Sequence, residues 1–306
     1  MQKRGKRFLV FFMLVTNFFW GLQPLQTQNS KHSIMLWCDA GYSTFFTKWD
    51  SFKNTGNMGA GIGLGYHITA WNHFTFSAGF QYLSLNSSIR PVNFTILKNL
   101  IDTEGDEYIM NYSLQKFVQI DRTHNVFIPI YLGFITDLKT ANFFIQAGGK
   151  IGYMFAANYS SKVSSFKTSG IYDPYIDPFE NMPNHYFDTK KYSRNAPLKL
   201  NKLQAVASLE FGVEIPSVIA DNSIRIGFFA DYGWLNRQSA EMKKHTKELI
   251  VFETIPNEIQ INSLYETNQK KSLTTTTFFA GVKITLLLDV IKPPCLNCLP
   301  KKRTSK

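Results

Sequence analysis

Apolar residues alternate with polar or small residues along the last long apolar stretch of the chain, residues 274–289. One set of alternate positions is apolar from Phe278 to Leu288, whereas the other set includes Lys283 and Asp289. A period of two residues places the two sets on opposite faces of a β-strand. An amphipathic helix repeats its apolar residues every three or four positions and would not place a lysine within its apolar stripe. We therefore predict a strand with two unlike faces.

The same alternation recurs in seven other stretches of the chain. Each has roughly the 9–11 residues that a tilted strand needs to cross a membrane. We expect the last strand to pair with the first, so that the set closes on itself. The eight predicted strands cover residues 33–44, 58–68, 74–82, 126–134, 143–155, 203–214, 224–234 and 274–289.

The connections between these strands alternate between long and short. Long connections cover about residues 47–57, 86–116, 160–199 and 237–272, and short ones cover about residues 70–73, 136–141 and 216–222. In an up-and-down barrel every second connection lies at the same rim, and outer-membrane barrels have short periplasmic turns and long extracellular loops. The predicted fold is therefore all-β: an eight-stranded antiparallel up-and-down transmembrane β-barrel with that loop arrangement.

The character of the polar face indicates which side of the barrel it occupies. It is rich in glycine, which suits a narrow interior, and an eight-stranded barrel is filled by its own side chains. Tyrosine and tryptophan lie near the ends of the apolar face, as in the aromatic girdle of a membrane barrel. We predict a closed lumen with paired charges. The predicted lumen charge network consists of Asp39, Lys150, Glu210, Glu214, Arg225, Asp231 and Lys283.

Both ends of the chain differ from the body. Residues 1–28 have a basic start and a short apolar run, which predicts a signal peptide and export. Residues 291–306 form a basic tail, which we expect in the periplasm, against phospholipid headgroups or a protein partner. These two segments carry nearly all of the net charge of +11, so residues 29–290 are almost neutral and a nucleic-acid partner is not expected. Cys295 and Cys298 could form a disulfide after export.

Three segments carry a resemblance to a known group of proteins. They are GAGIGLGYHI at Gly59–Ile68, FIPIYLGF at Phe127–Phe134 and FFAGVKITLLLD at Phe278–Asp289. The chain resembles the small eight-stranded outer-membrane barrels of Gram-negative bacteria, such as the OmpA membrane domain and OmpX, and especially the PorT-like barrels of Bacteroidota. The resemblance implies a place in the bacterial outer membrane and supports fold and location rather than an activity. The chain departs from the pattern in having a tail after its last strand.

The third long connection carries the candidate recognition residues. Aromatic residues near Asp-Pro turns and basic residues supply much contact energy in binding surfaces. A loop that packs its own aromatic residues over the barrel mouth is the alternative. We expect the fourth long connection to extend as a hairpin above the membrane, through residues 249–253 and 258–261. The candidate recognition residues are Tyr172, Tyr175, Phe179, Tyr186, Tyr192 and Arg194.

The predicted function is non-enzymatic. The barrel would act through its extracellular loops in recognition or adhesion, or as a component of an envelope, secretion-related assembly, with outer-membrane lipid around it. One alternative is a barrel enzyme that modifies lipid; His67 faces the predicted lumen, but no serine stands near it in a recurrent spacing. A second is a soluble lipocalin-like barrel that binds a ligand. No cofactor is expected, because the glycine alternation lacks the following helix of a dinucleotide site and Cys295 with Cys298 is half of a zinc site.

Overall fold

The computed structural model describes residues 30–47, 52–91, 94–102, 104–136, 138, 141–173, 175, 177–182, 187–216, 222–237, 250–252, 259–266 and 275–290. The predicted signal peptide, the basic tail, Cys295 and Cys298 lie outside these residues. Within them the fold is all-β, with one short 3-10 helix, η2 (Leu264–Glu266). The strands are β1 (Lys31–Thr47), β2 (Phe52–Ala70), β3 (Phe74–Pro91), β4 (Phe94–Ile101), β5 (Glu107–Ile135), β6 (Asn142–Tyr172), β7 (Thr189–Pro197), β8 (Leu203–Pro216), β9 (Ser223–Gly233), β10 (Ile250–Phe252), β11 (Ile259–Ile261) and β12 (Thr275–Asp289).

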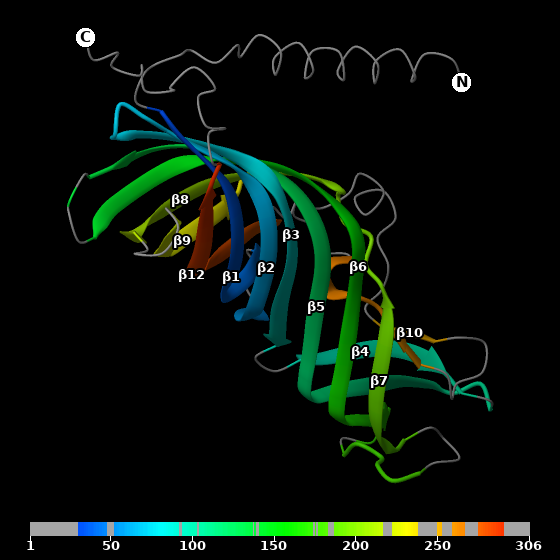
Figure 1. Cartoon of the computed structure of the whole chain (residues 1–306). Helices are drawn as coiled ribbons and strands as arrows, with labels where there is room; N and C mark the ends of the chain where they lie inside the picture. Colours follow the sequence, from blue (N-terminus) through cyan, green and yellow to red (C-terminus); the bar gives the residue numbers. More distant parts are fainter. Residues whose placement is uncertain are drawn as a thin grey trace, which may run out of the picture.

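Eight of these strands form a closed antiparallel ring, in the order β1, β2, β3, β5, β6, β8, β9 and β12. The ring closes where β12 pairs with β1, from Ser33 opposite Asp289 to Thr47 opposite Thr275. The predicted closure between the last strand and the first is thus confirmed. Figure 1 shows the ring strands curving around a common interior, with β12, β1 and β2 side by side.

The two faces of each ring strand are unlike, as the alternation predicts. Along β9 the burial alternates residue by residue, with Ser223, Arg225 and Asp231 buried and Ile224 and Phe228 exposed. Glycines on β2 leave room inside the ring for large side chains of β1. Gly63 lies opposite Trp37, and a methyl group added at Gly63 would overlap the Trp37 ring. The glycine alternation of β2 is therefore a packing requirement of the interior.

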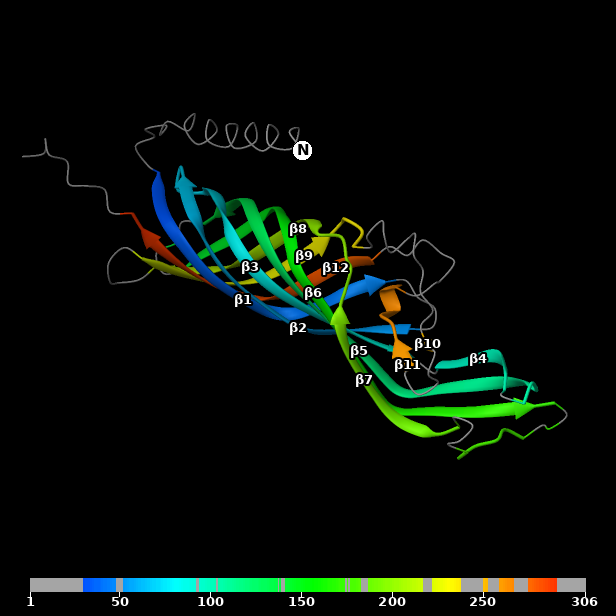
Figure 2. The same ribbon diagram turned by 90° about the vertical axis from the view of Figure 1, so that its right-hand side faces the viewer.

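Beyond the ring, β5 and β6 continue as a long hairpin and carry β4 and β7 on their outer edges. The four strands form an antiparallel sheet in the order β4, β5, β6, β7, which we call the extension. It is built from β4, residues 107–117 of β5, residues 158–172 of β6 and β7. Figures 1 and 2 show it projecting from one end of the ring.

The extension corrects the predicted loops. Residues 86–116 and 160–199 were expected as long loops, yet most of them lie in strands of the extension or of the ring. The predicted connection 47–57 is also wrong, because β1 ends at Thr47 and β2 begins at Phe52. There the register shifts between Gly56 and Ala60, which breaks the two-residue period that the prediction depended on. The expected hairpin in the last long connection is present as β10 paired with β11.

An apolar core lies where the extension meets the ring. It brings together buried side chains of β1, β5 and β6 with residues 261–265, which follow the β10–β11 hairpin. Ile261 and Leu264 are fully buried there, beside Phe45 and Tyr112. Residues 261–265 are therefore packed into the mouth of the ring.

Candidate functional site

Three ion pairs lie in the interior of the ring. Lys150 Nζ lies 2.6 Å from Asp231 Oδ2, Arg225 Nε lies 2.6 Å from Glu214 Oε2, and Lys283 Nζ lies 2.7 Å from Glu210 Oε2. All six side chains are buried. The paired groups come from β6, β8, β9 and β12. Arg225 and Glu214 are opposite each other on neighbouring strands, whereas the other two pairs each span one intervening strand. Burying such charges is tolerable only because each is paired and hydrogen-bonded.

Neutral side chains donate further hydrogen bonds to two of the paired carboxylates. The Gln146 amide donates to Glu210 Oε2 at 2.7 Å, and the Ser208 hydroxyl donates to Asp231 Oδ1 at 2.5 Å. The Lys283 ammonium also lies 5.1 Å from the centres of the Trp37 and Tyr131 rings. Cation–π contacts of this kind stabilise a desolvated ammonium.

Asp39, the seventh residue of the predicted network, has a different environment. It stands opposite Lys283 in the register of β1 and β12, but among the described residues it forms no ion pair. Its Oδ2 accepts a hydrogen bond of 2.5 Å from the Gln81 amide, and its Oδ1 has no hydrogen-bond partner in the part of the chain described. The network therefore contains four carboxyl groups and three basic side chains.

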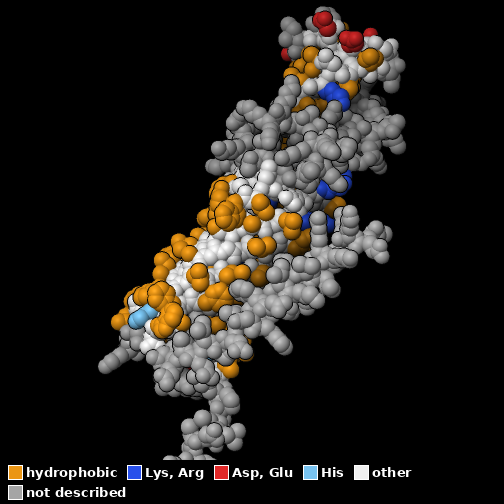
Figure 3. Space-filling view, turned by 90° about the horizontal axis from the view of Figure 1, so that it is seen from above, with side chains coloured by type: hydrophobic (Ala, Val, Ile, Leu, Met, Phe, Trp, Pro, Cys, Tyr) orange, Lys and Arg blue, Asp and Glu red, His pale blue; other side chains and the backbone are white. Residues whose placement is uncertain are grey.

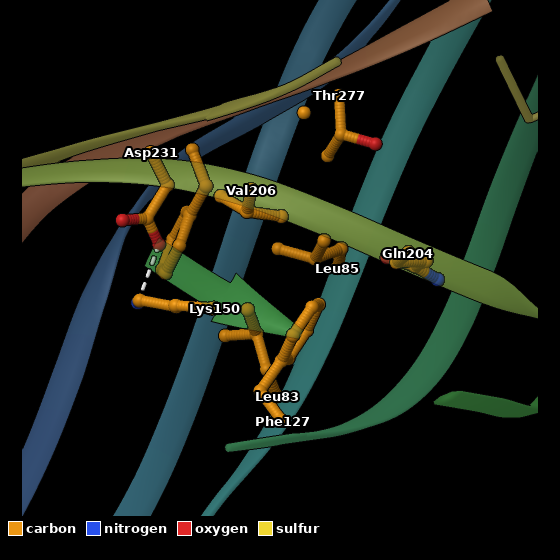
Figure 4. A pocket seen from close by; sticks show the side chains of 10 residues that line it. Leu83, Leu85, Phe127, Lys150, Gln204, Val206, Asp231 and Thr277 are labelled. Atoms are coloured by element: carbon orange, nitrogen blue, oxygen red, sulfur yellow. Dashed lines mark hydrogen bonds and ion pairs between the residues drawn. The ribbon is translucent and has the colours of Figure 1, made fainter. Parts of the chain in front are cut away.

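The interior is tightly packed beside one of these pairs. A cavity of about 10 Å³ lies beside the Lys150–Asp231 pair, between Leu83, Phe127 and Gln204 (Figure 4). A volume of this size holds about one water molecule. Side chains of the ring strands therefore pack closely around the Lys150–Asp231 pair.

His67 has a serine neighbour that the sequence did not reveal. Its Nδ1 lies 2.7 Å from the Ser77 hydroxyl, a contact that the spacing of serines along the sequence did not indicate. The two residues face each other across β2 and β3, where they are directly opposite in register. The two residues are ten positions apart in the sequence, and only the pairing of β2 with β3 brings them together.

The geometry of this pair does not suit nucleophilic catalysis. Arg225 Nη2 lies 2.9 Å from His67 Nε2. Because a guanidinium can only donate, Nε2 must accept, and the ring proton is on Nδ1, where it is donated to Ser77. A base that activates a serine must instead present an unprotonated nitrogen to the hydroxyl. Both side chains are also buried in the lumen.

The outer face of the ring is apolar. Ile62, Leu132, Ile151 and Phe228 each expose about 60 % or more of their surface. Figure 3 shows hydrophobic side chains spread over the surface of the ring, whereas acidic side chains gather at one end of the molecule. The six aromatic residues expected near the strand ends are all exposed by between 40 and 65 %: Tyr42, Tyr66, Tyr82, Tyr153, Tyr232 and Trp234.

The mouth of the ring contains a buried arginine. Arg237 Nη2 donates to Gln204 Oε1 at 2.6 Å, and the guanidinium lies over the Phe45 ring, 4.5 Å from its centre. Burial lowers the pKa of Arg237 to about 10. The Gln204 amide donates in turn to Asn125 Oδ1 at 2.6 Å. These side chains form a polar layer above the ion pairs and further close the lumen.

Above this layer, the buried Asp121 carboxyl group and Gln119 hold residues 263 and 264 in place. The Gln119 amide donates to Asp121 Oδ1 at 2.7 Å and to the Ser263 hydroxyl at 3.1 Å, and the Leu264 amide donates to Gln119 Oε1 at 2.9 Å. Asp121 is fully buried, and burial raises its pKa to about 7, although hydrogen bonds from Gln119 and Tyr265 oppose the shift. We call residues 259–266 the mouth segment.

We expect the mouth segment to be held less tightly at pH 8 than at pH 5. An exposed Asp121 releases its proton near pH 3.8, whereas the buried group keeps it to about pH 7. The stabilisation is therefore complete below about pH 3.8 and is lost as the pH rises through 7. Hydrogen exchange of the Leu264 amide, corrected for intrinsic rates, should show this trend, and Asp121→Asn should abolish it. An unchanged trend in Asp121→Asn would contradict the assignment.

Three of the six candidate recognition residues, Tyr172, Tyr175 and Phe179, pack against one another. The Tyr172 ring stacks on Tyr108 with centres 5.0 Å apart and meets Phe179 at 5.7 Å. Phe179 also contacts Tyr175, which is 62 % exposed. The Tyr192 hydroxyl accepts a hydrogen bond from the Ile261 amide at 3.2 Å. These aromatic contacts stabilise the extension. Tyr175 is the most exposed of the four candidate residues Tyr172, Tyr175, Phe179 and Tyr192.

The two remaining candidate recognition residues are placed differently. Arg194 lies on β7 opposite Ser161 of β6 and is half-buried. Tyr186 lies outside the described residues. Sequence reasoning named Trp37 and Gln81 only as members of the inward set, and it missed Asp121 because residue 121 lies outside the predicted strands.

Comparison with known proteins adds no family. No protein-family model and no curated protein matches this chain. Among the described residues, no helix is long and apolar enough to span a membrane, and no group of three or more His, Cys, Asp or Glu side chains could hold a metal ion.

Proposed function

We propose that the protein is a non-enzymatic β-barrel of the bacterial outer membrane, with a closed lumen, that presents its extension for recognition. The observation that carries this proposal is the inversion of the ring: charged and polar side chains fill its interior, and large apolar side chains cover its outside. A water-soluble protein rarely exposes a continuous apolar surface of this extent. In a bilayer the same surface would be in contact with lipid.

The arrangement supports the other parts of the proposal. A closed antiparallel ring leaves no unpaired strand edge in the apolar layer, which a lipid environment requires. The paired charges and the cavity of about 10 Å³ are inconsistent with a wide pore. The extension is the part of the described chain that projects furthest from the ring (Figure 2), and it would lie on the extracellular side, within reach of an envelope partner.

Neither alternative function gains a specific observation. A lipid-modifying enzyme would need a reactive pair near the rim. His67 and Ser77 are buried instead, and the proton on His67 Nδ1 points at the Ser77 hydroxyl, so His67 cannot act as its base. A lipocalin-like carrier would need an apolar cavity inside the ring, where the ion pairs lie instead. We therefore retain recognition, within or outside a larger envelope assembly, as the proposed function.

Cys38 offers a direct test of the membrane proposal. It is a free thiol on the outer face of β1, beside Leu36 and Ile62. In lipid vesicles, in a chain that carries Cys295→Ser and Cys298→Ser, we expect a lipid-soluble maleimide to label Cys38 and a charged maleimide to fail. Both reagents should label it after unfolding.

A matched control uses an exposed position of the extension. Ser193→Cys on β7, introduced with Cys38→Ser, should react rapidly with the charged maleimide under the same conditions. Rapid labelling of Cys38 by the charged reagent in vesicles would sink the membrane proposal. The comparison of two variants that each carry a single thiol, at residue 38 or at residue 193, excludes a general failure of the reagent.

A further inference from the structure

The two outer strands of the extension differ in how their free edges are protected. In the described part of the chain β4 pairs only with β5, and β7 pairs with β6 alone. Each therefore presents one row of backbone N–H and C=O groups without a strand partner. Such edges associate with other strands unless charge, proline or a covering segment prevents it.

Strand β7 carries the usual protection. Lys190 and Lys191 are exposed, Arg194 is half-buried, and the strand ends at the exposed Pro197. An added strand would have to desolvate these positive charges, which costs free energy unless that strand supplies acids, and a proline removes one backbone donor. This edge is therefore built to stay single.

Strand β4 lacks this protection. Its eight residues, FTILKNLI, include one charged side chain, Lys98, and no proline. Leu97 and Ile101 lie on the same face and expose 63 and 66 % of their surface, and Ile109 of β5 adds a third exposed apolar side chain beside them. An added strand would complete the hydrogen bonds of the edge and would place its alternate side chains beside Leu97 and Ile101 on this face.

The end of β4 adds a charge preference. It runs into a tight turn in which the Asp102 carboxylate accepts the amides of Glu104 and Asp106, each at 2.9 Å. Glu104, Asp106 and Glu107 are exposed. Four acids therefore stand at one end of the unprotected edge, and the partner that complements them carries basic residues at the matching end.

We infer that β4 is a docking edge for an extended segment of a partner protein, with apolar side chains at alternate positions and basic residues at the end that meets the turn at residues 102–107. The mode is strand addition, in which backbone hydrogen bonds supply affinity and alternate side chains supply selectivity. This inference rests on the proposed recognition function and names the element and the class of partner.

A synthetic peptide tests the inference with the full-length protein in detergent micelles. The probe is a fluorescein-labelled peptide with two lysines followed by alternating valine and threonine. We expect saturable binding by fluorescence anisotropy and slower hydrogen exchange at residues 94–101. Leu97→Lys, which copies the protection of β7, should weaken binding by about tenfold or more, whereas Ser193→Lys on β7 should leave it unchanged.

Two altered peptides separate strand addition from simple attraction. Methylation of alternate backbone nitrogens should abolish binding while it keeps every side chain, and replacement of the two lysines by glutamates should weaken it. Equal binding of the methylated peptide would overturn the inference. So would a disulfide dimer of Asn99→Cys that forms readily without peptide, because a second copy would then occupy the edge.

The outcome is distinguishable from a failure of the proposed function. If the peptide does not bind but Cys38 remains shielded from the charged maleimide, the membrane barrel stands and the docking edge is wrong. If Cys38 reacts freely in vesicles, the membrane proposal fails whatever the peptide does.

Discussion

Replacement of Lys283 by methionine should lower the free energy of unfolding by about 3–5 kcal/mol, the usual cost of breaking a buried ion pair from one side. Lys283 is buried and lies 2.7 Å from Glu210. Methionine keeps a similar length and the contacts with the Trp37 and Tyr131 rings, so the change removes mainly the charge. Glu210 would then remain buried as an unpaired charge that accepts a hydrogen bond from the Gln146 amide.

A double replacement distinguishes the lost charge from lost packing. Glu210→Gln together with Lys283→Met removes both charges, so its cost should be well below that of Lys283→Met alone. Denaturant unfolding in lipid vesicles, followed by tryptophan fluorescence and by heat-dependent gel migration, measures all the variants. If the double replacement costs as much as the sum of the single ones, the ion pair is not the cause.

The ring could be predicted from the sequence because its signal is local. Each ring strand has one face against the packed interior and one apolar face outside, so the period of two residues persists through most of each strand and fails only at register shifts such as that between Gly56 and Ala60. Glycine at positions such as Gly63 strengthened the prediction of a narrow interior. The closing pair of strands followed from the order of the alternating segments alone.

The extension could not be predicted in the same way. Residues 94–101 include apolar side chains on both faces, and residues 189–197 are largely polar, so neither segment shows a clean alternation. Their hydrogen-bond partners, residues 107–114 of β5 and 158–167 of β6, belong to the same sheet for reasons of long-range register. For this reason residues 86–116 and 160–199 were predicted as loops, although most of them lie in strands.

The composition of the lumen was predictable, but its pairing was not. The alternation identified which residues point inward. Lys283 stands directly opposite Asp39 on the neighbouring strand, yet it pairs with Glu210 on β8, two strands away around the ring. The partner of each charge depends on the stagger of strands across a closed interior, and a single sequence does not contain that information.

Replacement of Val282 by lysine should cost about 2–4 kcal/mol if the outer face of the ring lies in a bilayer, because a cation at mid-depth meets lipid chains. Val282 is exposed on the outer face of β12, near the middle of its apolar stretch and opposite Ala40. Alternation alone would rank this change above the loss of Lys283, since a lumen position tolerates polar residues. The buried pair with Glu210 makes the two effects comparable.

The same chemical change at the end of the strand supplies the control. Val290 is also exposed and follows the last residue of β12. Near the membrane surface a lysine can reach water and headgroups, so Val290→Lys should cost about 0–1 kcal/mol. Unfolding in vesicles should separate the two variants. Equal, small costs at both positions would mean that water, and not lipid, covers the outer face, because only a bilayer makes the cost of a surface lysine depend on its depth.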